Sequence, residues 1–165
     1  MPWIYFDQAD RNTPLPSLEV MSVHGRSINL GRTQNGQNRA VFFMHSLSRL
    51  KNNTVIDSLM SNHTRFVELD TSLVLVLTDL TGTLLDSPVI TNFPGYVISD
   101  PLGTIRSLFT HSLSDNLSGN DRGLLFVLDQ YGALYTAYSD VEFEGDHWLV
   151  DLLSWLEYIE IQCPE

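Results

Sequence analysis

The sequence predicts an α/β fold in which helices cover both faces of a β-sheet. Two observations predict it. Strand-like and helix-like segments alternate along the 165-residue chain, and a β-α-β unit lies before its middle. In that unit RAVFFMH (39–45) and SLVLVLT (72–78) are apolar runs of strand length. Between them, from Lys51 to Leu69, apolar residues recur at helical spacing, which predicts the connecting helix.

Turn and capping residues predict the elements on either side of this unit. LEVMSV (18–23) and SINL (27–30) predict a β-hairpin around Gly25. A short segment at 83–92 leads into the strand GYVIS (95–99). A helix should follow, with Asp100 as its cap and Pro101 at its first position. Its apolar positions share one face and are Leu102, Ile105, Leu108 and Phe109.

A second hairpin and a helix complete the chain. GLLFVLD (123–129) and ALYTAY (133–138) read as two strands joined by a tight turn. The last helix should run from Asp146 to about Ile161. Its broad apolar face predicts that it packs on the sheet, and comprises Trp148, Leu149, Leu152, Leu153, Trp155, Leu156 and Ile159.

Composition limits the classes of function. A hydrophobic content of 43% in 165 residues fits one compact domain. No apolar run is long enough to cross a membrane and the N-terminus lacks a targeting pattern, so we expect a soluble, cytoplasmic protein. The net charge of -11 should repel phosphate backbones and anionic lipid. Nucleic acid and membranes are therefore not expected as partners.

Cysteine and histidine usage limits the chemistry further. Cys163 is the only cysteine, which excludes an intramolecular disulfide, a CxxC pair and a thiolate metal cluster. The five histidines do not show the spacing of metal-binding motifs. We predict no metal and no cofactor, and Cys163 remains the one candidate for redox chemistry.

The order of elements resembles that of peroxiredoxin-like redoxins, the alkyl hydroperoxide reductase and thiol-specific antioxidant group of the thioredoxin-fold superfamily. Three stretches carry the resemblance, and they are PSLEVMSVHGRSINL (16–30), FPGYVISDP (93–101) and RGLLFVLDQYG (122–132). It implies a thioredoxin-like fold of the peroxiredoxin type, with a central mixed sheet, helices on both faces and an N-terminal β-hairpin. The domain would span 14–161, after an N-terminal extension (1–13) and before a C-terminal tail (162–165).

The family's activity needs a reactive thiolate where the first helix begins, because helix-end amides and a nearby cation lower its pKa. In VFFMHSLSRLKNN (41–53) the matching positions hold Ser48 and Lys51, or Arg49 and Asn52 if the alignment shifts by one residue. Neither alignment supplies sulfur. A serine hydroxyl cannot replace it, since oxygen has no sulfenic or disulfide state.

Two further features bear on this site. Arg122 matches the arginine that helps hold thiolate and peroxide in peroxiredoxins. Thioredoxin-type enzymes also have a cis-proline just before the strand that corresponds to GLLFVLD (123–129). At that position this chain has Arg122 or Gly123. This second departure argues against thiol–disulfide exchange.

The sequence therefore predicts a redoxin-like domain that lacks the family's oxidoreductase activity and acts as a binding or interaction module. Its partner would be a protein or a small molecule, and the resemblance also implies pairing into a homodimer. The predicted binding residues converge on the former active-site cleft and are Ser46, Ser48, Arg49, Lys51 and Arg122.

Two enzymatic alternatives stay open at this point. One is a single-thiol antioxidant or reductase that acts through Cys163. The other comes from SLVLVLTDLTGTLLDS (72–87), which resembles the first motif of haloacid dehalogenase-like phosphatases. In that case Asp79 would be the nucleophile, with Thr81 at the usual position of the acid/base aspartate. The chain lacks a lysine after residue 87 to bind the phosphate.

Overall fold

The computed structural model describes residues 3–6, 15–31, 37–46, 54–79, 87–111, 123–140 and 147–162, with the backbone alone at 45, 46, 54, 79 and 140. Its elements are, in chain order, β1 (Trp3–Tyr5), β2 (Glu19–Met21), β3 (Ser27–Asn29), β4 (Asn38–Ser46), α3 (Thr54–Ser61), α4 (His63–Glu68), β5 (Thr71–Asp79), α5 (Pro88–Thr91), β6 (Tyr96–Ser99), α6 (Thr104–Thr110), β7 (Gly123–Leu128), β8 (Leu134–Asp140) and α7 (His147–Gln162).

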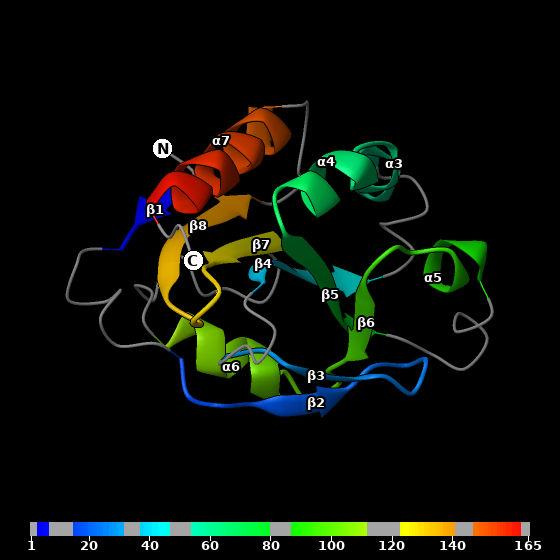
Figure 1. The fold of residues 1–165 in the computed structure, drawn as a ribbon. Coiled ribbons are helices and arrows are strands. Elements are labelled where there is room, and N and C mark those ends of the chain that lie inside the picture. The colour runs from blue at the N-terminus through cyan, green and yellow to red at the C-terminus, as the bar shows by residue number, and fades with distance from the viewer. Residues whose placement is uncertain are drawn as a thin grey trace.

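The main sheet is mixed, as predicted, and has the strand order β1-β8-β7-β4-β5-β6. Strands β4, β5 and β6 are parallel, whereas β7 and β8 are antiparallel to their neighbours. The parallel β4–β5 pair confirms the predicted β-α-β unit. The apolar run of β4 lies between β7 and β5, so it is the central strand that the sequence indicated (Figure 1).

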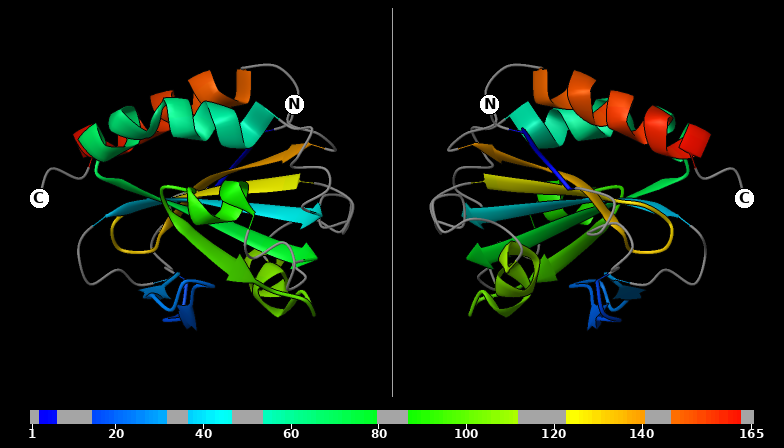
Figure 2. Two further views of the ribbon diagram at one scale, coloured as in Figure 1. Left: turned by 90° about the vertical axis from the view of Figure 1, so that its right-hand side faces the viewer. Right: turned by 90° about the vertical axis from the view of Figure 1, so that its left-hand side faces the viewer.

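Both faces of the sheet are covered. Helices α3, α4 and α7 lie on one face, and α6 and the β2–β3 hairpin lie on the other (Figures 1 and 2). Side chains that alternate along β4 divide between the two layers. Phe42 belongs to the core under the three helices, and Phe43 to the core under α6 and the hairpin. This alternation is what a strand with two buried faces requires.

The hairpins and the terminal helix agree with the sequence-based prediction. Gly25, with a φ of 82°, forms the turn between β2 and β3, and Gly132 lies between β7 and β8. A left-handed backbone of this kind favours glycine because it has no Cβ. Helix α7 buries most of its predicted apolar face, whereas Leu153 and Trp155 are only partly buried. Among the described helices, none is both long and apolar enough to cross a membrane.

The helix predicted from Lys51 to Leu69 is two helices within the described part. Helix α3 ends at Ser61 and α4 begins at His63, with Asn62 between them. The Asn62 side chain donates to the Ser58 carbonyl at 2.8 Å, in addition to the Asn62 backbone N–H, which donates to the same carbonyl at 3.1 Å. Asparagine commonly forms such local bonds and so favours helix ends over helix interiors.

The prediction for α6 is partly wrong. The helix begins at Thr104, and Pro101 lies in the preceding turn. Leu102 and Leu108 are 90% and 45% exposed, whereas Ile105 and Phe109 are buried as predicted. The reason is a left-handed turn at Gly103, with a φ of 68°, which starts the helix later and rotates its face toward the sheet.

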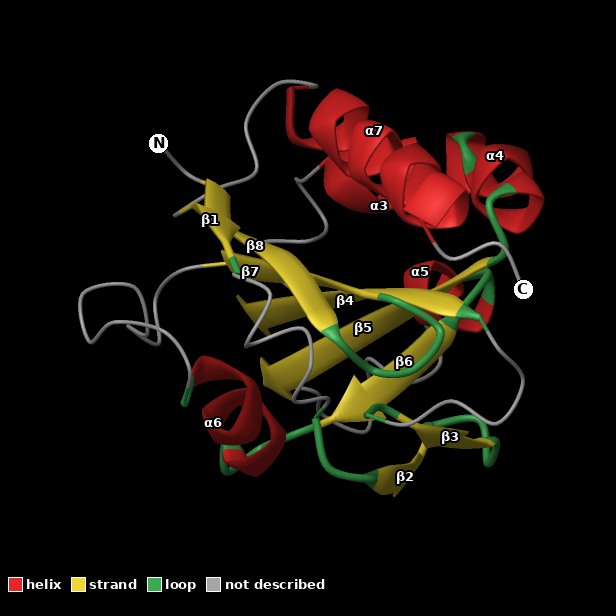
Figure 3. Cartoon of the chain, turned by 60° about the vertical axis from the view of Figure 1, so that its left-hand side comes forward, coloured by secondary structure: helices red, strands yellow, loops and turns green. Residues whose placement is uncertain are grey.

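Strand β1 was not predicted. It pairs with β8 at the edge of the sheet, where Figure 3 shows the two strands side by side. The Trp3 ring packs against Tyr138, and its Nε1–H donates to Asp151 Oδ2 of α7 at 2.9 Å. A three-residue strand is too short for a periodic pattern, so these long-range contacts define it.

Candidate functional site

The predicted site lies at the edge of the sheet where β4 and β5 end. Ser46 is the last residue of β4 and pairs directly with Asp79, the last residue of β5. Strand β7 begins at the same edge with Gly123 and runs antiparallel to β4. Six residues of the predicted sites lie outside the described residues, and they are Ser48, Arg49, Lys51, Thr81, Arg122 and Cys163.

Strand β4 is held firmly on both faces just before this edge. On one face the Phe42 ring meets Trp148 of α7 edge-on, with centroids 5.9 Å apart. On the other, the Phe43 ring contacts Phe109 of α6 and Phe126 of β7 at 5.1 and 5.7 Å. All five side chains are buried. Close packing of this kind fixes the position of the strand up to its last residue, Ser46.

Asp100 organises the neighbouring strand end. Its backbone N–H donates to the Leu77 carbonyl at 2.8 Å, which continues the β5–β6 pairing. Its carboxylate accepts from the N–H groups of Ile105 at 3.2 Å and Arg106 at 3.0 Å, the second and third positions of α6. The carboxylate thus bonds to amides of the first turn of α6, but the predicted cap position is wrong, because Gly103 is the residue that directly precedes the helix.

Arg106 was missed by the sequence interpretation. Its side chain is buried, and burial lowers the pKa of the guanidinium, while the charge of Asp100 opposes that shift. The spacing could have pointed to it. Arg106 is six positions after Asp100 and lies in the first turn of α6, close to that carboxylate. The sequence interpretation assigned only apolar residues to the buried face of this helix and therefore did not expect a buried arginine.

Helix α7 runs antiparallel to β4. Near its start Trp148 packs on Phe42, and near its end Glu160 Oε1 accepts from Asn38 Nδ2, at the first residue of β4, at 2.7 Å. Figure 2 shows the end of α7 on the side away from the arrowheads of β4 and β5. The chain therefore leaves α7 beside the amino end of β4, opposite to Ser46.

Arg39 is a second buried cation that the sequence interpretation passed over. It heads the apolar run of β4 and is only 6% exposed. Within the described part of the chain, its Nε and Nη1 have no hydrogen-bond partner. Burial lowers the pKa of Arg39 to about 10, against an opposing contribution of Tyr96, so the side chain stays charged at neutral pH. The sequence did contain an indication of this burial. Arg39 alternates with Val41 and Phe43, so its side chain lies on the same buried face of β4.

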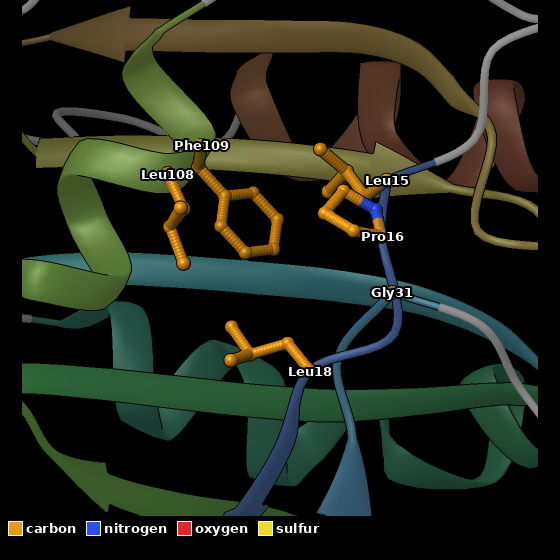
Figure 4. A pocket seen from close by; sticks show the side chains of 6 residues that line it. All are labelled: Leu15, Pro16, Leu18, Gly31, Leu108 and Phe109. Carbon is orange, nitrogen blue, oxygen red and sulfur yellow. The ribbon is translucent and has the colours of Figure 1, made fainter.

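A small apolar pocket lies between α6 and the segments that flank the β2–β3 hairpin. Figure 4 shows its lining, which consists of Leu15, Pro16, Leu18, Gly31, Leu108 and Phe109. None of these side chains can form a hydrogen bond. Specific ligand sites combine apolar walls with a few polar groups, so this pocket lacks the means to orient a ligand.

Comparison with known proteins extends these observations. No protein-family model matches the chain, and no curated protein matches it either. Several solved structures, however, are similar to it. The fold is that of the thioredoxin-like α/β proteins, with a 14% identical thioredoxin domain of a thiol-disulfide oxidoreductase from Bacteroides vulgatus as one match (TM-score 0.56, 88% of this chain and 95% of that chain).

Peroxiredoxins are more similar still. A peroxidoxin, BcpB, from Mycobacterium tuberculosis is 16% identical over 88% of this chain and 95% of its own, with a TM-score of 0.67. The mitochondrial 2-Cys peroxiredoxin of Plasmodium falciparum is also 16% identical, over 92% and 96%, with a TM-score of 0.64. The predicted thioredoxin-like fold of the peroxiredoxin type is thus confirmed.

Proposed function

We propose that this chain is a redox-inactive member of the thioredoxin fold and acts as a binding or interaction module. Its site would be the edge where β4 and β5 end. The predicted residues Ser46, Ser48, Arg49, Lys51 and Arg122 would contact a protein or a small molecule there. In sheets with parallel strands, ligands commonly bind outside the carboxyl ends of those strands, which supports this choice of edge.

The direction of α7 is the observation that carries the proposal. Cys163 directly follows Gln162, the last residue of α7. The bond between Glu160 and Asn38 ties that end of the helix to the amino end of β4. Strand β4 has nine residues, so Ser46 is about 26 Å from Asn38 at roughly 3.3 Å per residue. The only thiol thus follows a helix that runs away from the edge where the peroxiredoxin resemblance puts the thiolate.

A test of redox inactivity compares the protein with its Cys163→Ser variant. We expect both to consume hydroperoxide and reduce insulin disulfides no faster than a protein-free control, because the segment 41–53 contains no cysteine. Peroxide consumption and insulin precipitation measure the two activities. Turnover that the Cys163→Ser variant loses would overturn the proposal in favour of the single-thiol alternative.

A second test asks whether the edge keeps the electrostatics of a thiolate site. In a Cys163→Ser background, Ser48→Cys or Arg49→Cys should give a thiol with a pKa below that of an ordinary cysteine, because amides at a helix start and nearby cations stabilise a thiolate. The rate of alkylation against pH measures this pKa. The variant with the lower pKa identifies the correct alignment of the turn.

The matched control for this test is Ser61→Cys. Ser61 is exposed and is the last residue of α3, where the helix dipole disfavours a negative charge. Its thiol should react with an ordinary or raised pKa. If Ser48→Cys and Arg49→Cys both titrate like Ser61→Cys, the turn does not retain the character of the peroxiredoxin site.

A further inference from the structure

The opposite edge of the sheet, where β4, β5 and β6 begin, carries a second group of polar side chains. Arg39 of β4 pairs in register with Ser72 of β5, and Val74 of β5 pairs with Tyr96 of β6. Arg39 shares the face of the sheet that packs under α6 and the hairpin, because it alternates with Val41 and Phe43. The hairpin adds Arg26 to the same place, since its Nη2 donates to the Gly95 carbonyl at 2.8 Å.

These side chains differ in how much of each is exposed to solvent. Arg26 is exposed and its guanidinium lies 4.6 Å from the centroid of the Tyr96 ring, which is partly buried. Arg39 is 6% exposed and is close enough to Tyr96 for the two to interact electrostatically. The Tyr96 ring therefore has the Arg26 guanidinium over it, an arrangement that arginine favours, and Tyr96 lies on the same face of the sheet as Arg39.

The polar groups beside Arg39 are engaged with one another. Ser72 Oγ donates to Gln37 Oε1 at 2.6 Å, and Gln37 Nε2 donates to Asp70 Oδ1 at 3.4 Å. No carboxylate of the described residues lies within ion-pair distance of Arg39. A guanidinium has five donors and no acceptor, and a buried charge is costly unless it is paired. Arg39 thus lacks the acceptor that its burial calls for.

We propose that Arg39, with Arg26 and Tyr96, binds a small oxyanion, a carboxylate or phosphate group, at the edge where β4, β5 and β6 begin. Such a group supplies charge-assisted hydrogen bonds to the donors of Arg39. Arg26 is exposed at the same edge and attracts the anion electrostatically. This site is separate from the edge at which β4 and β5 end, and it does not depend on the function proposed for that edge.

Thermal unfolding in the presence of anions tests the site. Inorganic phosphate and acetate are each titrated against sodium chloride at equal ionic strength, which separates specific binding from screening. The wild-type Tm should rise saturably with at least one of the two anions, and the more effective anion identifies the class of ligand. By calorimetry, Arg39→Met should bind that anion at least tenfold more weakly than the wild type.

Arg65→Met is the matched control. Arg65 is a partly exposed arginine of α4 that pairs with Glu68 and Glu157 on the other face of the sheet, so the variant should keep the full response to the anion. Arg39→Met should also retain its fold, with an anion-free Tm no lower than that of the wild type, because it removes an uncompensated buried charge. An equal response of Arg39→Met and wild type to the anion would overturn the proposal.

A measurement on the wild-type protein keeps the proposal testable without any variant. The Arg39 Nε–H resonance should shift in the nuclear magnetic resonance spectrum as phosphate or acetate is added, while that of Arg65 should not. A resonance of Arg39 that stays in place at saturating amounts of both anions would exclude the site.

Discussion

Replacing Phe43 by alanine is expected to destabilise the protein by about 3 to 5 kcal/mol. Phe43 is 1% exposed, and its ring contacts those of Phe109 and Phe126, which are themselves 5.2 Å apart. The three rings join β4 to α6 and β7. Truncation at Cβ removes one ring of the three and leaves a cavity, because a close-packed core relaxes only partly.

Urea denaturation measures this loss, and a fall in Tm of about 10 °C should accompany it. Leu102→Ala is the matched control. Leu102 is also apolar and lies next to α6, but it is 90% exposed, so its removal should change the free energy of unfolding by less than about 0.5 kcal/mol. A loss below about 1 kcal/mol for Phe43→Ala would mean that the remaining rings collapse into the space.

The second large effect is expected for Asp100→Ala, with a loss of about 2 to 4 kcal/mol. The variant removes the carboxylate that accepts from the N–H groups of Ile105 and Arg106. It also removes the negative charge that offsets the burial of the Arg106 guanidinium. Two amides at the start of α6 would lose their acceptor, and the Arg106 guanidinium would lose a nearby negative charge.

Urea denaturation gives the size of this loss, and amide hydrogen exchange at Ile105 and Arg106 gives its location. Asp57→Ala is the control, since Asp57 is also an aspartate near a helix start but is exposed. It should change stability by no more than about 0.5 kcal/mol. If Asp100→Ala and Asp57→Ala cost the same, Asp100 does not organise the end of β6.

The elements that the sequence predicted are those with a strong local pattern. The runs of β4 and β5 are continuously apolar because both faces of these strands are buried, and their lengths separate them from helices. The hairpin at Gly25 followed from turn chemistry, because few residues adopt a positive φ. Each of these signals lies within about ten neighbouring residues, so no tertiary information was needed.

The errors occurred where distant segments decide the outcome. The face of α6 depends on how the turn at Gly103 directs the helix toward β4 and β7, and the capping motif alone does not contain that direction. The strand ends at the candidate site show the same dependence on distant segments. The sequence placed Ser46 and Asp79 at strand ends, whereas their direct pairing comes from the register of β4 and β5.

Two cations show the same division. Arg39 and Arg106 stand in the printed sequence as ordinary charged residues, which usually lie at the surface. Their burial follows from the packing of α6 and the hairpin against the sheet. Whether such a charge is compensated depends on groups that come from other strands, and these are brought near only by folding.

The sequence by itself determined the chemistry that is available, because the number and kind of side chains do not depend on folding. One cysteine, Cys163, is all the sulfur that thiol chemistry could use. Only the tertiary structure decided the direction of the helix that precedes Cys163. Helix α7 runs antiparallel to β4, and the bond between Glu160 and Asn38 fixes its end beside the start of that strand. Packing direction, which is set by contacts between distant residues, therefore places the end of α7 away from the edge where β4 and β5 end.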